Sequence, residues 1–183
     1  MAKIIFKEVF LFGANPDHFN RLFAKQRYKG AADAVLGGFT KIVRAFCPER
    51  EYELIRKEML SHGVEPDSIQ FHKTLHTTYY NAVEMGQIRA KLDLREHEVC
   101  VSSNVYHGRA SYFANARHDF KSVFIPSEAF TFARVNEDER MVLLEEMCKE
   151  YGDGPLTRLI IDDVKGIGTD LAGEYKTPPQ PHE

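Results

Sequence analysis

Short apolar runs alternate along this chain with longer segments in which apolar residues recur every three or four positions. The short runs contain β-branched or aromatic residues and end at glycine, proline or small polar residues, which is typical of buried strands. They predict five strands, over 9–12, 34–36, 68–71, 99–101 and 123–125. The strand over 34–36 is expected to end in a turn at Gly37 and Gly38.

The longer segments have helical spacing, and capping residues mark where several of them begin. Pro48 and Glu49 lead into a further helix expected over 49–62, and Gly63 follows its end. The capping signals are Asn15 and Pro16 before a helix over 16–28, Thr77 or Thr78 before the next helix, and Asn136 with Glu139 as a capping box near the carboxyl end.

This alternation of strands and helices predicts an α/β fold, a Rossmann-like three-layer α/β/α sandwich with a mainly parallel sheet of about five strands. Both common doubly wound strand orders fit the pattern. We expect a single domain over 1–176. The segment 177–183 contains three prolines and no apolar periodicity, which predicts a flexible tail.

Composition narrows the classes of partner. The chain has 183 residues, 24 basic against 27 acidic, for a formal charge of -3, so we expect no nucleic-acid binding. No uncharged apolar run is long enough for a membrane span, and Lys7 and Glu8 interrupt the apolar amino terminus before it resembles a signal peptide. The cysteines Cys47, Cys100 and Cys148 are odd in number and far apart, as in a reduced cytoplasmic protein.

The turns that follow the predicted strands are rich in small and hydrogen-bonding residues. In a parallel sheet these turns meet at the carboxyl edge, where backbone amides at helix starts attract a phosphate or carboxylate. The alternative is that these residues only cap helices and relieve turns. The candidate ligand-binding residues are Gly13, Asn15, Gly37, Gly38, Thr78, Ser102 and Ser103.

His107 and Arg109 are the candidate catalytic residues. An imidazole exchanges a proton near neutrality, and a guanidinium holds an oxyanion at two points. Both reach one ligand only if Gly108 lies in a turn; otherwise they are a plain surface pair. Ser102 or Ser103 with His107 as base is a weaker hypothesis, because the chain has no G-x-S-x-G elbow.

The remaining motifs identify no cofactor and no metal. The glycine pair lacks the G-x-G-x-x-G fingerprint and the phosphate-loop lysine, which excludes those two nucleotide motifs. His72 and His76 are four residues apart, but they straddle a strand end and a loop, which does not favour zinc.

Several short motifs follow one another between about residues 8 and 127: Gly13, Arg21, the stretch Ala-Asp-Ala-Val-Leu-Gly-Gly over 32–38, Thr78 with Asn81, and Ser103 with His107 and Arg109. Their order resembles that of the YdcF-like family, also called the SanA and ElyC family. Thr77 and Tyr80 stand where the family usually has Asn and Glu, and His107 and Arg109 are one residue closer together than in the family pattern. The resemblance implies a Rossmann-like sandwich with a polar pocket, to which Arg21 and Asn81 contribute, and in several relatives a role in cell-envelope biogenesis. The position of Arg21 in the first helix favours packing of its stem on the sheet or pairing with a carboxylate, and its spacing from Asn15 leaves the ligand site as the alternative.

Together these patterns predict binding of an anionic, phosphate-bearing or nucleotide-like small molecule at the carboxyl edge of the sheet. If the chain is an enzyme, we expect a transferase or hydrolase in which His107 carries the proton and Arg109 clamps the developing negative charge. The alternative is a non-catalytic metabolite-sensing or protein-interaction domain, which Tyr80 in place of the family's Glu favours.

Overall fold

A five-stranded parallel sheet forms the centre of the computed structural model, which describes residues 5–13, 21–75, 77–108 and 122–173. The strands lie in the order β3-β2-β1-β4-β5, and every neighbouring pair is parallel. The predicted fold class is confirmed, and of the two doubly wound orders the sheet has the Rossmann-like one. The strands are β1 (Glu8–Phe12), β2 (Ile42–Cys47), β3 (Ile69–Lys73), β4 (Val99–Ser103) and β5 (Val123–Pro126).

The helices begin where local signals predict in two testable cases. The side chain of Thr77 accepts a hydrogen bond from the Tyr80 amide, and Asn136 and Glu139 form the reciprocal capping box. The helices are α1 (Arg21–Leu36), α2 (Glu49–Ser61), α3 (Thr78–Lys91), α5 (Ser127–Arg134), α6 (Glu137–Tyr151) and α7 (Pro155–Leu171), with 3-10 turns η1 (Pro66–Ser68), η2 (Glu96–Glu98) and η3 (Val105–His107).

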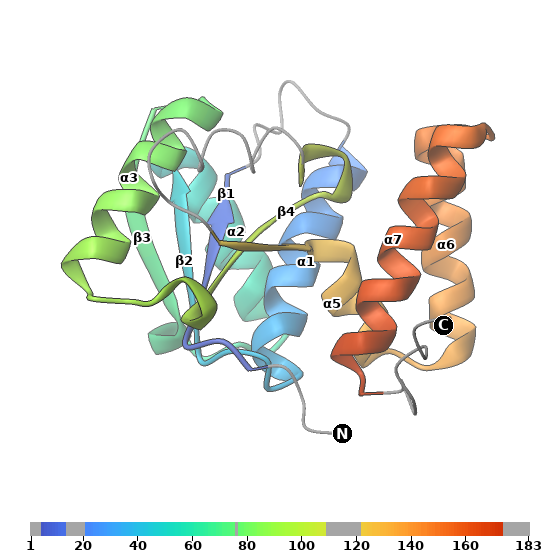
Figure 1. Cartoon of the computed structure of the whole chain (residues 1–183), viewed down its shortest axis with the longest axis horizontal. Helices are drawn as coiled ribbons and strands as arrows, with labels where there is room; N and C mark the ends of the chain where they lie inside the picture. Colours follow the sequence, from blue (N-terminus) through green and yellow to red (C-terminus); the bar gives the residue numbers. More distant parts are fainter. Residues whose placement is uncertain (1–4, 14–20, 76, 109–121, 174–183) are drawn as a thin grey trace, which may run out of the picture.

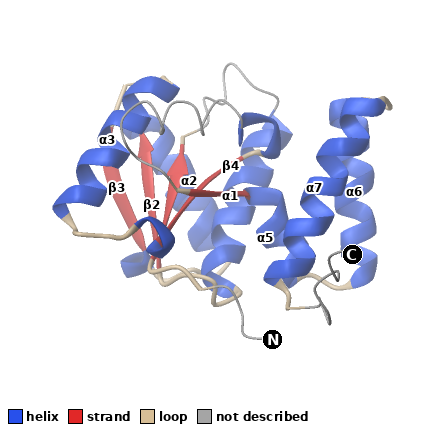
Figure 2. Cartoon of the chain, in the orientation of Figure 1, coloured by secondary structure: helices blue, strands red, loops and turns tan. Residues whose placement is uncertain are grey.

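Two hydrophobic cores lie on opposite faces of the sheet, because successive strand residues point to opposite sides. Val9, Leu11 and neighbouring alternate residues pack against α1, α2 and α5. Phe10 and Phe12 pack on the other face with Met85 and Ile88 of α3. The described helices thus form layers on both sides, with α6 and α7 lying side by side beyond α5 (Figures 1 and 2).

The prediction of a strand over 34–36 is wrong, because α1 continues to Leu36. Gly30 does not end the helix; it lets the backbone of α5 approach, and a Cβ at this position would lie 2.1 Å from the Ser127 carbonyl oxygen. The glycine pair ends the helix rather than a strand: the Gly37 amide donates to Asp33 O at 2.8 Å, and Gly38 has a φ of 74°.

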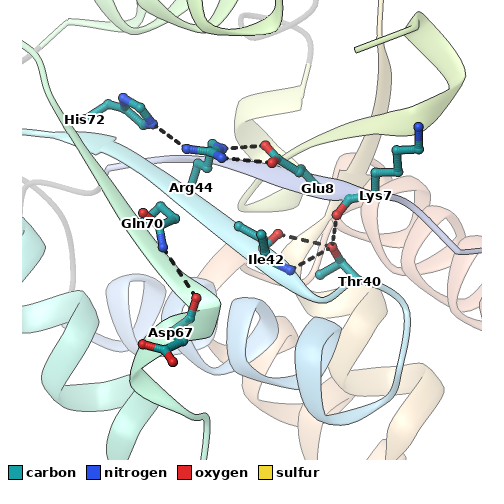
Figure 3. Close-up of polar contacts among 8 residues, drawn as sticks. All are labelled: Lys7, Glu8, Thr40, Ile42, Arg44, Asp67, Gln70 and His72. Carbon is teal, nitrogen blue, oxygen red and sulfur yellow. Dashed lines mark hydrogen bonds and ion pairs between the residues drawn. The ribbon is translucent and has the colours of Figure 1, made fainter. Parts of the chain in front are cut away.

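The true second strand is β2, which the apolar pattern misses because Arg44 interrupts it. The guanidinium of Arg44 forms an ion pair with the carboxylate of Glu8 on the neighbouring strand and lies 3.1 Å from His72 Nε2 on the other side (Figure 3). Burial and the charge of Arg44 lower the pKa of His72. The three side chains satisfy one another across β1, β2 and β3, so a charged residue is tolerated within the sheet.

Two further predictions concern the ends of the chain and the membrane. Within the described ranges, every helix is too short or too polar to cross a bilayer. The predicted tail over 177–183 lies outside the described residues, as do positions 14–20, where the first helix was expected to begin.

Candidate functional site

The candidate site lies at the carboxyl ends of β1 and β4. From β1 the chain proceeds outward through β2 and β3, and it then returns to place β4 on the other side of β1. The strand order therefore reverses between β1 and β4, and ligands of open α/β sheets bind beside the strand ends at such a switch point. Gly13 follows β1, Ser103 ends β4, and Thr78 begins α3 at the same edge.

His107 lies between Ser103 and Thr78 at the carboxyl edge of the sheet. Its Nδ1 is 3.1 Å from Ser103 Oγ and its Nε2 is 3.0 Å from Thr78 Oγ1, so both ring nitrogens are hydrogen-bonded to hydroxyls. The ring also meets the edge of Phe12, with centroids 5.5 Å apart. Residues predicted from two separate turns, Thr78 before α3 and Ser103 with His107 after β4, therefore meet at one point.

The imidazole of His107 is neutral at physiological pH. Burial, together with the nearby positive charge of Arg27, lowers its pKa to about 4. A neutral imidazole has one N–H donor and one acceptor nitrogen. One of the two hydroxyls therefore donates to the ring while the other accepts from it.

Arg27 links the ends of β1 and β4 through hydrogen bonds. This α1 residue is only 2% exposed, and it donates to the carbonyl oxygens of Phe12 and Gly13 after β1 and, at 2.7 Å, to Asn104 Oδ1 after β4. Burial lowers the pKa of the guanidinium. Its donors are used on the scaffold, so Arg27 contributes shape and a fixed positive field rather than a free ligand clamp.

Glu128, the second residue of α5, supports the loop that carries His107. Its carboxylate accepts from Asn104 Nδ2 at 2.7 Å and from the Val105 amide at 2.9 Å, at the start of η3. Burial raises the pKa of this carboxyl group, although both hydrogen bonds oppose the shift. The hydrogen bonds that link Arg27 to Asn104 and Asn104 to Glu128 thus fix the turn that carries the imidazole of His107.

Three of the other predicted site residues lie at or near this edge of the sheet. Gly13 is at the edge and must be glycine, since a Cβ there would lie 2.4 Å from Cys47 Cβ. Ser102 donates to the Ile125 carbonyl at 2.7 Å and is 3.0 Å from Ser127 Oγ, so it faces α5 instead of His107. Asn81 is buried and accepts from the Thr74 hydroxyl near the start of α3.

Gly37 and Gly38 do not belong to this edge. They follow the carboxyl end of α1, and Phe39 O accepts from the Phe6 amide at 2.7 Å, just before β1 begins. They therefore lie at the amino edge of the sheet, opposite the candidate site, which corrects their assignment as ligand-binding residues there. Arg21 is the first described residue of α1, while Asn15 and Arg109 lie outside the described residues.

The sequence contains one overlooked signal for Arg27. It stands four residues after Phe23, and residues four apart share a helix face, so the apolar stripe of the first helix continues into a charged residue. Glu128 carries no comparable signal, because an acidic residue in a first helical turn is ordinary on a surface.

Comparison of the chain with protein-family models, with curated proteins and with solved structures finds no match. The function is therefore inferred from the geometry at the ends of β1 and β4. That geometry brings two hydroxyls, a neutral imidazole and a buried positive charge together at one edge of the sheet.

Proposed function

We propose that this chain binds a phosphate-bearing or nucleotide-like small molecule at the carboxyl edge between β1 and β4. The observation that carries the proposal is the imidazole of His107, held between the hydroxyls of Ser103 and Thr78 at the switch point. Ligands of open α/β sheets bind at this position, and hydroxyl and imidazole groups are suitable partners for phosphate oxygens.

The charges around this edge favour an anion. The fourteen-residue α3 begins here with no acidic residue in its first turn, so its positive dipole end is not compensated by a side chain of that turn. The buried charge of Arg27 adds a positive field. Two buried carboxyl groups offset part of that field: Glu128, whose oxygens accept hydrogen bonds from Asn104 and Val105, and Glu51, which lies beside Gly13.

Binding and turnover are separate functions of this site. With a pKa of about 4, His107 is a weak base, which favours the non-catalytic, metabolite-sensing alternative. An anionic ligand beside the ring would raise the pKa of His107 and make the imidazole a better proton carrier for a transferase or hydrolase. The ligand therefore decides between the two roles.

The test is thermal unfolding against inorganic phosphate, nucleotides and sugar phosphates, with Thr78→Val as the site variant. This substitution removes one hydroxyl from the imidazole and keeps the side-chain shape. We expect one compound to raise the unfolding midpoint of the wild-type chain and to lose that effect in Thr78→Val. His97→Gln, in η2 at the opposite edge, is the control and should keep the shift.

A phosphate-bearing compound that binds should then be assayed with His107→Ala. In an enzyme this variant loses turnover while binding is largely retained; in a sensor it changes affinity alone. A wild-type midpoint unmoved by the whole panel, or an equal shift in Thr78→Val, would contradict a ligand site at this edge.

A further inference from the structure

Two exposed tyrosines stand beside the candidate site. Tyr79 and Tyr80 directly follow Thr78 at the start of α3, and they are 49% and 48% exposed. Among the described phenylalanines and tyrosines they are the only exposed ones, since all the others are buried or partly buried. Exposed apolar side chains that lie together mark a binding surface, whereas scattered single ones do not.

The two rings form one aromatic surface. Their centroids are 5.3 Å apart and their planes meet at 86°, so the edge of one ring contacts the face of the other. Edge-to-face contact is a preferred geometry for aromatic pairs, and this contact by itself uses only one ring face. The pair therefore offers half-exposed ring surface on which another flat ring can stack.

This aromatic surface belongs to the same edge of the sheet as the candidate site. Thr78, the first residue of α3, has its Oγ1 3.0 Å from His107 Nε2, so the helix begins at that edge. Side chains on a helix lean towards its amino terminus, so Tyr79 and Tyr80 lean towards the edge that holds His107. A ligand held by its phosphate at Thr78 has the two tyrosines as its next neighbours along α3.

We propose that the ligand of this site is a nucleotide: its phosphate lies at His107 and Thr78, and its base stacks on the Tyr79–Tyr80 pair. Every nucleobase has a face that stacks on an aromatic side chain, whereas a sugar phosphate has no flat ring. The inference rests on the proposed function, which supplies the position of the phosphate, and it adds the class of ligand.

The experiment measures by calorimetry the binding of AMP, UMP and ribose 5-phosphate, which has the sugar and the phosphate but no base. We expect the wild-type chain to bind one of the two nucleotides about fivefold or more tightly than ribose 5-phosphate. Replacing both rings, in Tyr79→Leu/Tyr80→Leu, should abolish this preference and leave ribose 5-phosphate binding unchanged. Tyr79→Phe/Tyr80→Phe keeps both rings and should keep the preference.

Leu92→Ala is the control, because it shortens another exposed apolar side chain at the far end of α3 and should change no affinity. The unliganded unfolding midpoints show whether each variant folds. The nucleotide assignment is overturned if the leucine variant keeps the preference, if the phenylalanine variant loses it, or if nucleotide binding is unchanged in Thr78→Val.

The failure of this inference is distinguishable from that of the proposed function. If AMP, UMP and ribose 5-phosphate bind the wild-type chain equally and Thr78→Val weakens all three, the phosphate site stands and the nucleotide assignment is wrong. If none of the three binds, both proposals are contradicted.

Discussion

Acidification should destabilise the chain through His107, and the size of the effect follows from its surroundings. The ring is held between Ser103 and Thr78, with Arg27 nearby, and its pKa falls from 6.5 to about 4 on folding. Between these two values the unfolded chain binds a proton that the folded chain does not. Stability is therefore complete above about pH 7 and is lost as the pH falls from 6.5 towards 4.

The loss of unfolding free energy with falling pH is steepest where the folded and unfolded states differ most in bound protons. At pH 5 the unfolded imidazole is almost fully protonated and the folded one is mostly neutral, which corresponds to about 2 kcal/mol of lost unfolding free energy. His107 keeps partial contact with solvent, which weakens this effect. We therefore expect about 1–2 kcal/mol between pH 8 and pH 5 from this one residue.

The assay is urea unfolding of the wild-type chain and of His107→Gln at pH 8 and pH 5. Glutamine keeps hydrogen-bonding capacity but does not titrate, so the loss between the two pH values should be about 1–2 kcal/mol smaller in the variant. Comparing each protein with itself cancels any change that the substitution causes at both pH values. His97→Gln controls for the loss of a histidine outside the site. An identical pH dependence in His107→Gln and wild type would refute the buried, neutral imidazole.

Two further substitutions test the packing around the site. Gly30→Ala should lower the unfolding free energy by about 1–3 kcal/mol, because its Cβ would meet the Ser127 backbone. Gly166→Ala in α7 has open space around the new Cβ and should raise the unfolding free energy by up to about 1 kcal/mol. Urea unfolding measures both changes. Arg27→Met should cost about 3–5 kcal/mol by the same measurement, because it leaves the carbonyls after β1 without their donor and Glu128 without its nearby cation. A cost below about 1 kcal/mol would show that Arg27 does not hold the strand ends together.

Local signals predicted most of the secondary structure correctly. The caps at Thr77 and Asn136 depend only on residues within one helical turn, so the sequence contains everything needed to recognise them. The runs that became β1 and β4 are apolar because both faces of those strands are buried. The alternation of these elements was enough to predict the α/β class.

The errors occurred where contacts between distant residues decide the structure. Gly30 looks like a helix breaker until Ser127, almost a hundred positions later, is seen against it. Arg44 looks like the end of an apolar run until Glu8 and His72 are placed on the neighbouring strands (Figure 3). In both cases a long-range partner changes the meaning of a residue, and no local pattern contains that partner.

The same contrast separates the predicted from the unpredicted part of the candidate site. Ser103, Thr78 and His107 were predictable because parallel strands bring their carboxyl ends to one edge, whatever the strand order. Arg27 and Glu128 were not, because charged residues are usually exposed. Burying two charges is costly, and many apolar replacements would suit a simple core better. Both residues bond to the turn that carries His107, so their burial is better explained by the precise position of the imidazole than by stability, which supports a functional role for the carboxyl edge at β1 and β4.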